Sequence, residues 1–250
     1  MARDRRAGRL YSLGLQRHDQ LNRAFGGGLP RGSLVLVEGG YGTGKTTLAG
    51  RLAYGLCTES HTVSYLSTER PVGTFIDRMR SLSYDVTAAL LDRDLLYLFG
   101  DVAGMVSEAG EPLPLLPRLT ESRRMWDAEV AIVDAFGDVL RYDPSFAAMA
   151  DAESRRRAAH QVVSFFRRLA RADRTVVLTV DPGWLAPETL APFRAGADVV
   201  LELTATSGGR GVRRRIDVRR FMGAGGQVDD SVAFSIRAGI GLVVENRQVV

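Results

Sequence analysis

The spacing of glycines around a single lysine indicates a phosphate-binding loop. Lys45 is the only lysine in the chain, and it lies in the segment VEGGYGTGKTTLAGRL, residues 37–52. Glycines let successive backbone N–H groups turn toward an anion at the N-terminus of a helix. The segment fits the P-loop pattern, Gly-x4-Gly-Lys-Thr. The predicted nucleotide-binding residues are Gly39, Gly40, Tyr41, Gly42, Thr43, Gly44, Lys45, Thr46 and Thr47.

The side chains of this loop have separate predicted roles. Lys45 would reach the β- and γ-phosphates, where a compact ammonium fits better than a planar guanidinium. Thr46 would give its hydroxyl to Mg²⁺. The alternative is a glycine-rich turn with a surface lysine. The setting favours the P-loop, because an apolar run at residues 34–37 predicts a buried strand before it and apolar residues at helical spacing predict a helix after it.

Two acidic residues follow apolar runs and could serve the same site. Asp134 ends the run EVAIVD and would hold Mg²⁺ as a Walker B carboxylate; alternatively, it caps the next turn. Glu69 follows a predicted strand and is the catalytic candidate, able to orient and deprotonate water; alternatively, it faces solvent. Asp138 is a weaker acid candidate that we expect to be solvated.

Strands alternate with helices along most of the chain, and strands alone fill its end. We predict strands at residues 34–37, 62–67, 95–99, 130–133 and 175–180, helices at 15–25, 72–82, 119–126 and 151–172, loops at 26–33 and 100–117, a hairpin of 199–204 with 212–220, and closing strands at 232–236 and 239–244. Thr68 would cap the helix at 72–82, whose buried face would include Val72. This order predicts an α/β fold with a mainly parallel sheet flanked by helices and antiparallel C-terminal strands.

The composition is that of an ordinary globular protein. The 250 residues are 45% hydrophobic and 25% charged, with a net charge of +4. No apolar run approaches the roughly 18 residues of a membrane span, and the N-terminus lacks the apolar region of a signal peptide. One cysteine excludes an intrachain disulfide, and three distant histidines give no zinc-type spacing. We therefore expect a cytoplasmic protein.

Several segments resemble the KaiC branch of the RecA-like P-loop ATPases. They are YSLGLQRHDQLN at residues 11–22, GGGLPRGS at 26–33, YLSTE at 65–69, VVLTVDP at 176–182 and AGIGLVVE at 238–245. Within that branch the chain is most similar to the FlaH (ArlH) family, the ATP-binding components of archaeal flagellum (archaellum) motors. The resemblance implies one RecA-like ATP-binding domain over residues 1–250, with a lead-in at 1–33 and β additions at 199–250.

The resemblance also implies cofactors and partners. The expected cofactors are ATP and Mg²⁺, with Lys45 at the phosphates, Thr46 and Asp134 at the metal and Glu69 at the catalytic position. The expected partners are the motor ATPase FlaI and the membrane platform FlaJ, at the cytoplasmic face of the membrane. Self-association into a homo-oligomer is left open.

Two departures from the family pattern bear on hydrolysis. Ala135 stands where the KaiC branch usually has Ser, and Asp181 stands at the sensor position, where the family tends to have His or Gln. An acid beside a triphosphate repels it unless a metal intervenes. We therefore expect little or slow hydrolysis.

Arginine clusters leave a second function open. Residues 155–157, 167–171 and 213–220 carry arginines that a RecA/RadB-like DNA-dependent ATPase of recombination would use against phosphates. The alternative is a solvated helix face and a polar hairpin. A small-molecule kinase is a third interpretation, although the sequence shows no acceptor-pocket signature and no arginine-rich lid.

Overall fold

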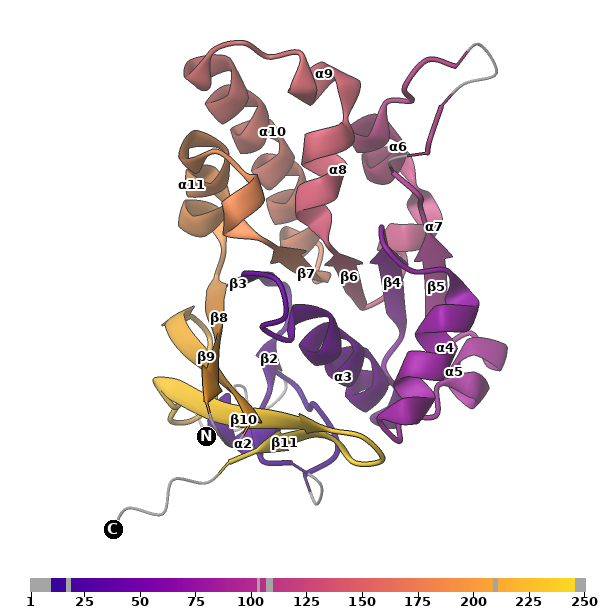
Figure 1. Ribbon diagram of the computed structural model, residues 1–250, viewed down its shortest axis with the longest axis vertical. Coiled ribbons are helices and arrows are strands. Elements are labelled where there is room, and N and C mark those ends of the chain that lie inside the picture. The colour runs from indigo at the N-terminus through magenta and orange to yellow at the C-terminus, as the bar shows by residue number, and fades with distance from the viewer. Residues whose placement is uncertain (1–9, 17–18, 103, 107–109, 209–210, 246–250) are drawn as a thin grey trace.

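The computed structural model describes residues 10–16, 19–102, 104–106, 110–208 and 211–245, and its central feature is a nine-stranded sheet. The strands of the sheet are β3 (Leu34–Gly39), β4 (Val63–Ser67), β5 (Leu95–Phe99), β6 (Val130–Asp134), β7 (Thr175–Val180), β8 (Val199–Gly208), β9 (Gly211–Phe221), β10 (Ser231–Arg237) and β11 (Gly241–Val244). Their order across the sheet is β11-β10-β9-β8-β3-β7-β6-β4-β5 (Figure 1).

The sheet is parallel in its larger part. Neighbouring strands from β8 to β5 pair in parallel, whereas β9, β10 and β11 extend the β8 edge with antiparallel pairing. This confirms the predicted mainly parallel sheet with antiparallel C-terminal strands. The parallel strands are almost uninterrupted apolar runs, as expected for strands covered on both faces.

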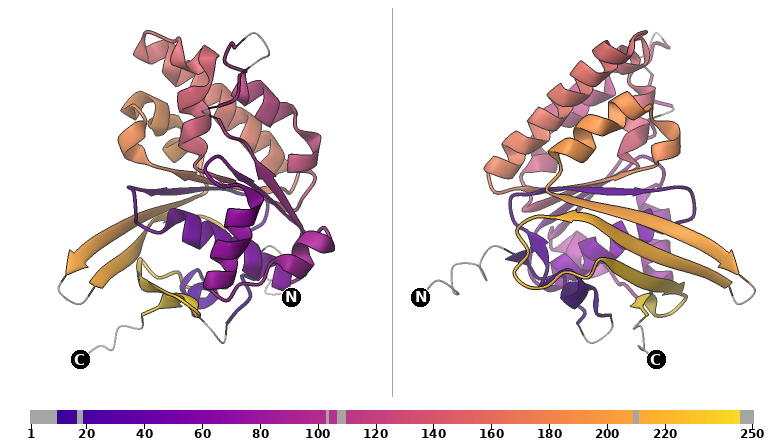
Figure 2. Two further views of the ribbon diagram at one scale, coloured as in Figure 1. Left: turned by 45° about the vertical axis from the view of Figure 1, so that its right-hand side comes forward. Right: turned by 90° about the vertical axis from the view of Figure 1, so that its left-hand side faces the viewer.

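Helices cover both faces of the sheet, and a separate hydrophobic core lies between the sheet and the helices on each face (Figures 1 and 2). One face is covered by α3 (Lys45–Thr58), α4 (Val72–Ser81) and α5 (Thr87–Leu91). The other is covered by α6 (Leu115–Glu121), α7 (Arg123–Trp126), α8 (Phe136–Tyr142), α9 (Pro144–Ala147), α10 (Ala152–Arg171) and α11 (Pro187–Gly196). The predicted helix at 151–172 is confirmed as α10, whose inner face buries Ala159, Val162, Val163 and Phe166.

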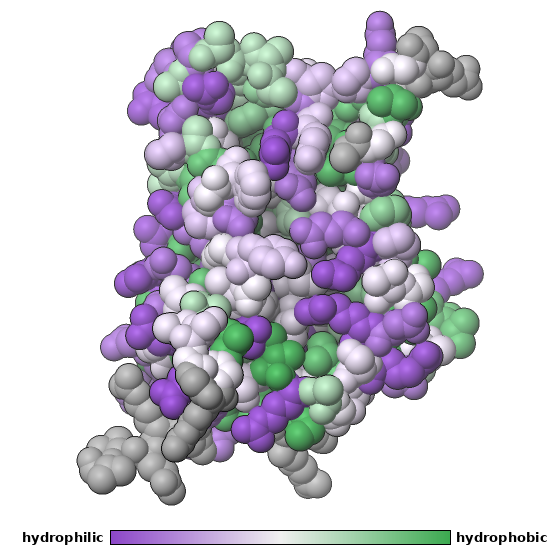
Figure 3. All heavy atoms as spheres, viewed as in Figure 1, coloured by the Kyte–Doolittle hydropathy of each residue, from purple (hydrophilic) through white to green (hydrophobic). Residues whose placement is uncertain are grey.

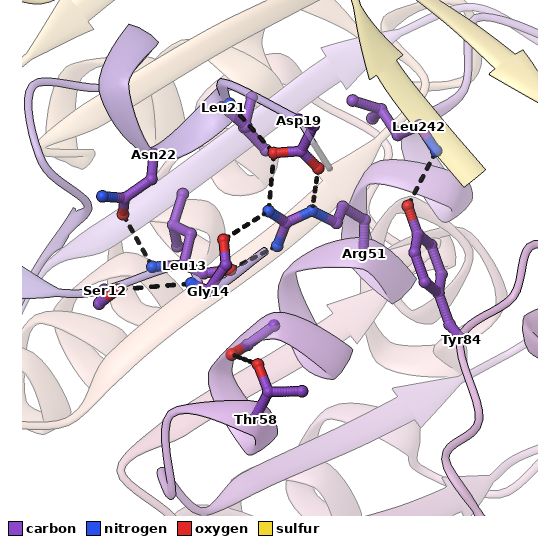
Figure 4. Close-up of polar contacts among 11 residues, drawn as sticks. Ser12, Leu13, Gly14, Asp19, Leu21, Asn22, Arg51, Thr58, Tyr84 and Leu242 are labelled. Carbon is purple, nitrogen blue, oxygen red and sulfur yellow. Dashed lines mark hydrogen bonds and ion pairs between the residues drawn. The ribbon is translucent and has the colours of Figure 1, made fainter. Parts of the chain in front are cut away.

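The helix predicted at residues 15–25 is mostly wrong. Among the described residues of this segment, only α2 (Leu21–Ala24) is helical, and Leu15 has a φ of +57°. The fully buried Arg51 of α3 explains why no longer helix is described here. Its guanidinium forms an ion pair with Asp19 and donates a hydrogen bond to the carbonyl of Gly14 at 3.0 Å (Figure 4). The left-handed backbone at Leu15 cannot be part of a right-handed α-helix. Residues 17 and 18 lie outside the described residues.

The segment predicted as a loop at 26–33 contains a short strand. A two-stranded sheet forms between β1 (Leu10–Tyr11) and β2 (Leu29–Pro30), apart from the main sheet. Composition alone predicted a loop because glycines and a proline dominate the segment. The pairing comes instead from residues about twenty positions upstream.

The C-terminal hairpin is confirmed and is longer than predicted. Its strands β8 and β9 pair along their length and project beyond the body of the molecule (Figure 2); the turn residues 209 and 210 lie outside the described residues. The closing strands are confirmed as β10 and β11, although β11 begins only at Gly241. The hydroxyl of Tyr84, beyond α4, accepts the N–H of Leu242 at 2.8 Å and so joins β11 to that layer (Figure 4).

Three local predictions need correction. Thr68 does not cap α4, because Pro71 holds that position and the Thr68 hydroxyl donates to the carbonyl of Ala135 at 3.4 Å. Val72, expected on the buried face, is 47% exposed because it lies in the first, open turn of the helix. The helix predicted at 119–126 is two helices separated at Ser122, and α6 starts inside the expected loop.

The face of the molecule drawn in Figure 3 is mainly polar. Hydrophilic side chains dominate the face drawn in Figure 3, and hydrophobic ones form small separated groups. Among the described residues, no helix combines the length and the apolar character needed to cross a bilayer.

Candidate functional site

The loop between β3 and α3 opens into a cavity at the carboxyl ends of the parallel strands. The cavity has a volume of about 300 Å³. The predicted site residues that line it are Tyr41, Gly42, Gly44, Lys45, Thr46, Thr47, Glu69, Asp134 and Asp181. Gly39, Gly40 and Thr43 form the back of the loop, where the Thr43 hydroxyl donates to the Gly40 carbonyl at 2.9 Å. The fold thus brings together residues that lie at or after the carboxyl ends of four strands, β3, β4, β6 and β7.

The backbone of the loop needs glycine at defined positions. Gly44, immediately before α3, has a φ of +103°, a conformation that L side chains rarely adopt. A Cβ on Gly39 would lie 2.6 Å from the Thr43 hydroxyl and 2.7 Å from the carbonyl oxygen of Leu203. A Cβ at Gly40 or Gly42 would meet only open space, so the loop presents bare backbone there. No side chain caps α3, which leaves the N–H groups of its first turn available to an anion.

Lys45 is folded back over the loop. Its ammonium donates to the carbonyls of Gly39, at 2.6 Å, and Gly40, at 2.9 Å. Burial lowers its pKa, while the nearby carboxylates of Asp181 and Asp134 act in the opposite direction. A half-buried cation held by neutral carbonyls, next to uncapped N–H groups, suits a phosphate.

Asp134 is the buried carboxylate of the site, with only 2% of its surface exposed. It accepts hydrogen bonds from the hydroxyls of Thr179 at 2.7 Å, Tyr65 at 2.9 Å and Thr46 at 3.3 Å. Burial and the charge of Asp134 raise the pKa of Tyr65 well above its usual value, so this phenol remains a donor. The Thr46 hydroxyl and the Asp134 carboxylate are adjacent oxygen donors, the kind of ligand that Mg²⁺ prefers. The residues therefore fit the predicted magnesium site.

Glu69 and Asp138 line the cavity beside this pair. Glu69 is exposed to solvent, as the alternative interpretation expected, yet it also lines the cavity. Desolvation by its neighbours, and then the charge of Asp134, raise its pKa. Asp138 is half-buried rather than solvated as expected, because α8 directs it toward the Thr68 hydroxyl at 3.4 Å. Burial raises the pKa of Asp138 as well.

Asp181, the predicted sensor residue, follows β7. Its carboxylate accepts the N–H of Gly183 at 2.9 Å and so caps a single 3₁₀ turn, Pro182–Trp184. It lines the cavity, and among the neighbouring charges it does most to favour the protonated form of Lys45.

Five further residues, which the sequence patterns did not indicate, help to form the site. Tyr65 and Thr179 orient Asp134, and Arg70, Arg78 and Arg214 line the cavity. Thr179 could have been found from the sequence, because it is a polar residue near the carboxyl end of an apolar strand. Arg214 of β9 donates a hydrogen bond to the carbonyl of Gly42 at 3.2 Å. No sequence pattern could indicate this contact, because the two residues are distant in sequence.

Comparison with known proteins agrees with this architecture. An archaeal flagellar ATP-binding protein FlaH from Methanocaldococcus jannaschii is 28% identical over 227 residues, covering 91% of this chain and 92% of that protein. FlaH from Methanococcus voltae is 26% identical, covering 91% and 94%. The crystal structure of the flagellar accessory protein FlaH from M. jannaschii superposes with a TM-score of 0.83 at 27% identity, covering 95% of this chain and 99% of that one.

The family assignment rests on the whole match. The model of the KaiC ATPase family matches residues 18–246, which include the P-loop, Asp134 and the C-terminal strands. The resemblance to FlaH and to RecA-like ATPases inferred from the sequence is thereby confirmed, as is the RecA-like fold. This chain belongs to the KaiC family of ATPases.

Proposed function

We propose that this chain binds ATP with Mg²⁺ as a regulatory component of an archaellum motor. In this proposal, residues 1–250 form one nucleotide-binding domain at the cytoplasmic face of the membrane. The nucleotide state of the chain sets its affinity for a FlaI-type motor ATPase beneath the platform FlaJ. The FlaH relatives support the motor context, since they are named as archaeal flagellar ATP-binding proteins.

One observation carries the nucleotide-binding part of the proposal. Lys45, Thr46 and Asp134 converge in one cavity, although the first two begin helix α3 and Asp134 ends strand β6, almost ninety residues later. The loop amides and Lys45 would hold the phosphates, and Thr46 with Asp134 would hold Mg²⁺. When bound, Mg²⁺ would neutralise phosphate charge. Without it, the carboxylates around Lys45 would repel a triphosphate.

Slow hydrolysis is the second part of the proposal. Glu69 supplies a base at the rim, so cleavage by water has a candidate catalyst. Support for the terminal phosphate is weak on the other side of the cavity. Asp181 brings a negative charge there, and Ala135 brings no hydrogen-bonding side chain.

The regulatory part of the proposal requires differential binding. ATP changes partner affinity only if it binds the docking-competent state more tightly than the other state. The cavity lies at the ends of β3, β4, β6 and β7, where the connecting segments can respond to a bound phosphate and metal. We therefore expect the docking surface to form around this rim.

The test is the affinity of the purified chain for a FlaI-type motor ATPase, measured with ATP, with ADP and without nucleotide. We expect the tightest binding with ATP, and weaker binding for Lys45→Ala under the same condition. Arg80→Ala is the matched control, because Arg80 is exposed on α4 and pairs only across one helical turn with Asp77. Equal affinity in all three nucleotide states would refute the regulatory role.

The DNA-dependent alternative finds less support in the contacts of its arginines. Arg155 pairs with Glu188, Arg219 with Glu202, and Arg220 donates to the carbonyls at the end of α11. Guanidinium groups engaged in this way are less available to a nucleic-acid backbone. Single-strand DNA binding that is tight and falls steeply with salt would favour this alternative.

A further inference from the structure

Two arginines face the cavity beside Glu69. Arg70 follows Glu69 directly, and Arg78 lies on the helix α4 that comes next. Within the described residues, the ion pairs of the protein include neither guanidinium. An arginine facing a cavity without a carboxylate partner is unusual, because buried charges are normally paired.

The immediate contacts of the two side chains leave them available to a ligand. The Nε atom of Arg70 is buried and has no hydrogen-bond partner among the described residues. Arg78 donates through Nη2 to the hydroxyl of Thr47 at 2.7 Å, beside the metal-binding candidate Thr46. The two guanidinium groups are near enough to repel each other, since burial and then the charge of Arg70 lower the pKa of Arg78. An anion placed between them would relieve this repulsion.

The topology places these arginines where the end of a phosphate chain would lie. β4 pairs with β6 so that Ser67 is opposite Asp134, and Arg70 comes three residues after Ser67. In the proposed site, the loop amides would hold the phosphates nearest the nucleoside, Lys45 would reach the β- and γ-phosphates, and Asp134 would mark the metal position. A phosphate beyond that metal position lies between the P-loop and the end of β4. That is the side lined by Arg70 and Arg78.

We propose that Arg70 and Arg78 bind the terminal phosphate of ATP from within the same chain, and that this pair makes the site distinguish ATP from ADP. The inference rests on the proposed nucleotide site. It assigns recognition of the third phosphate to the rim of β4 and α4, and not to Asp181 on the opposite side. The two cations offset the negative charge that Asp181 and Glu69 bring to the cavity. Binding of ATP, but not of ADP, would draw α4 toward the P-loop.

The experiment compares the affinities of a non-hydrolysable ATP analogue and of ADP, each with Mg²⁺, by titration calorimetry. For Arg70→Ala we expect affinity for the ATP analogue to fall about ten-fold or more, as expected for the loss of charge-assisted hydrogen bonds. Affinity for ADP should stay unchanged within error. Arg78→Ala should have the same selective effect, and Arg78→Lys should restore part of the affinity for the ATP analogue.

Controls separate this inference from the nucleotide site itself. Arg80→Ala removes an exposed arginine from the same helix and should change neither affinity. Lys45→Ala should weaken both nucleotides, because it acts on the shared phosphates. Melting temperatures show whether each variant is folded, and Arg70→Ala leaves the Arg78–Thr47 contact intact.

The possible results distinguish failure of this inference from failure of the proposed function. If Arg70→Ala weakens both nucleotides equally, or neither, the inference is wrong while the nucleotide site stands. If the unmodified chain binds neither nucleotide, the proposed function is wrong and the inference falls with it. A loss confined to the ATP analogue supports the inference.

Discussion

Glu69 lies at the end of β4, where its raised pKa makes it a stronger base than an ordinary glutamate. We expect the isolated chain to hydrolyse ATP well below the typical enzyme rate of about 10 s⁻¹, because the opposite side of the cavity supports the terminal phosphate poorly. Glu69→Gln should reduce the remaining rate by about 10²- to 10⁴-fold and leave ATP affinity nearly unchanged. A phosphate-release assay measures the rates. Fast turnover by the unmodified chain alone would contradict this account.

Asp138 gives a prediction about pH. Burial raises its pKa, so the folded state binds its proton more tightly than the unfolded state does. The charged side chain therefore costs stability at neutral pH. Asp138→Asn should be more stable than the unmodified chain at pH 7, because asparagine keeps an acceptor for Thr68 without the charge. The gain should shrink as pH falls through the raised pKa toward the ordinary aspartate value.

Urea unfolding at several pH values measures this difference. Asp77→Asn is the control, because Asp77 is exposed on α4 and should give a nearly pH-independent difference. An Asp138→Asn variant that is less stable at pH 7 would show that the charge is needed for folding, contrary to the expected sign.

At the residue level, the sequence could predict where side chains gather when one short segment holds the whole pattern. The P-loop spacing indicated the cradle around Lys45, and an apolar run indicated where Asp134 would lie. Tyr65 and Thr179 were missed because their role is to orient Asp134 across strands that are far apart in sequence. Asp138 was expected to be solvated because its hydrogen-bond partner, Thr68, follows β4 and lies seventy residues earlier in the sequence.

At the scale of elements, the lead-in is attached to the P-loop helix by one buried ion pair. Arg51 of α3 and Asp19 are both almost fully buried and make two hydrogen bonds, at 2.5 and 2.8 Å (Figure 4). The same guanidinium also binds the carbonyl of Leu13. This cluster, rather than local helix propensity, fixes the positions of Leu13, Gly14 and Asp19 against α3.

Removing one partner of this pair should be costly. Arg51→Met would leave the Asp19 carboxylate buried without a counter-charge, and we expect the free energy of unfolding to fall by about 3–5 kcal/mol. Urea unfolding provides the measurement. In the matched control Arg80→Ala, an exposed pair is lost and the expected change is below about 1 kcal/mol. A loss of similar size in both variants would mean that Arg51 does not hold the lead-in.

Elements with strong internal periodicity were predictable, and elements defined by distant contacts were not. The amphipathic α10 and the apolar strands follow from the sequence because burial repeats at a regular interval along them. The strand β2 and the bend at Leu15 depend on residues elsewhere in the chain, so local patterns gave the wrong structure. The short helices α8 and α11 were not predicted from the sequence, because neither shows apolar residues at helical spacing over a long stretch.

At the scale of the whole molecule, the sheet order explains how one cavity gathers the site. β3 is followed across the sheet by β7, β6 and β4. The P-loop therefore emerges at the same edge as Asp181, Asp134 and Glu69, which lie at or just after the carboxyl ends of those strands. The antiparallel strands then bring Arg214 of β9 to the outer side of the loop. The alternation of strands and helices predicted this parallel sheet, but its order needed the structure.

The most direct test is calorimetric titration of ATP with Mg²⁺ into the unmodified chain and into Lys45→Ala. Lys45 is the cation of the loop, and its loss removes a charge-assisted contact worth roughly 1.5–3 kcal/mol. We expect saturable binding by the unmodified chain and binding roughly ten- to a hundred-fold weaker by Lys45→Ala, with Arg80→Ala unaffected. Equal affinity in the unmodified chain and Lys45→Ala, or no binding by the unmodified chain, would contradict it.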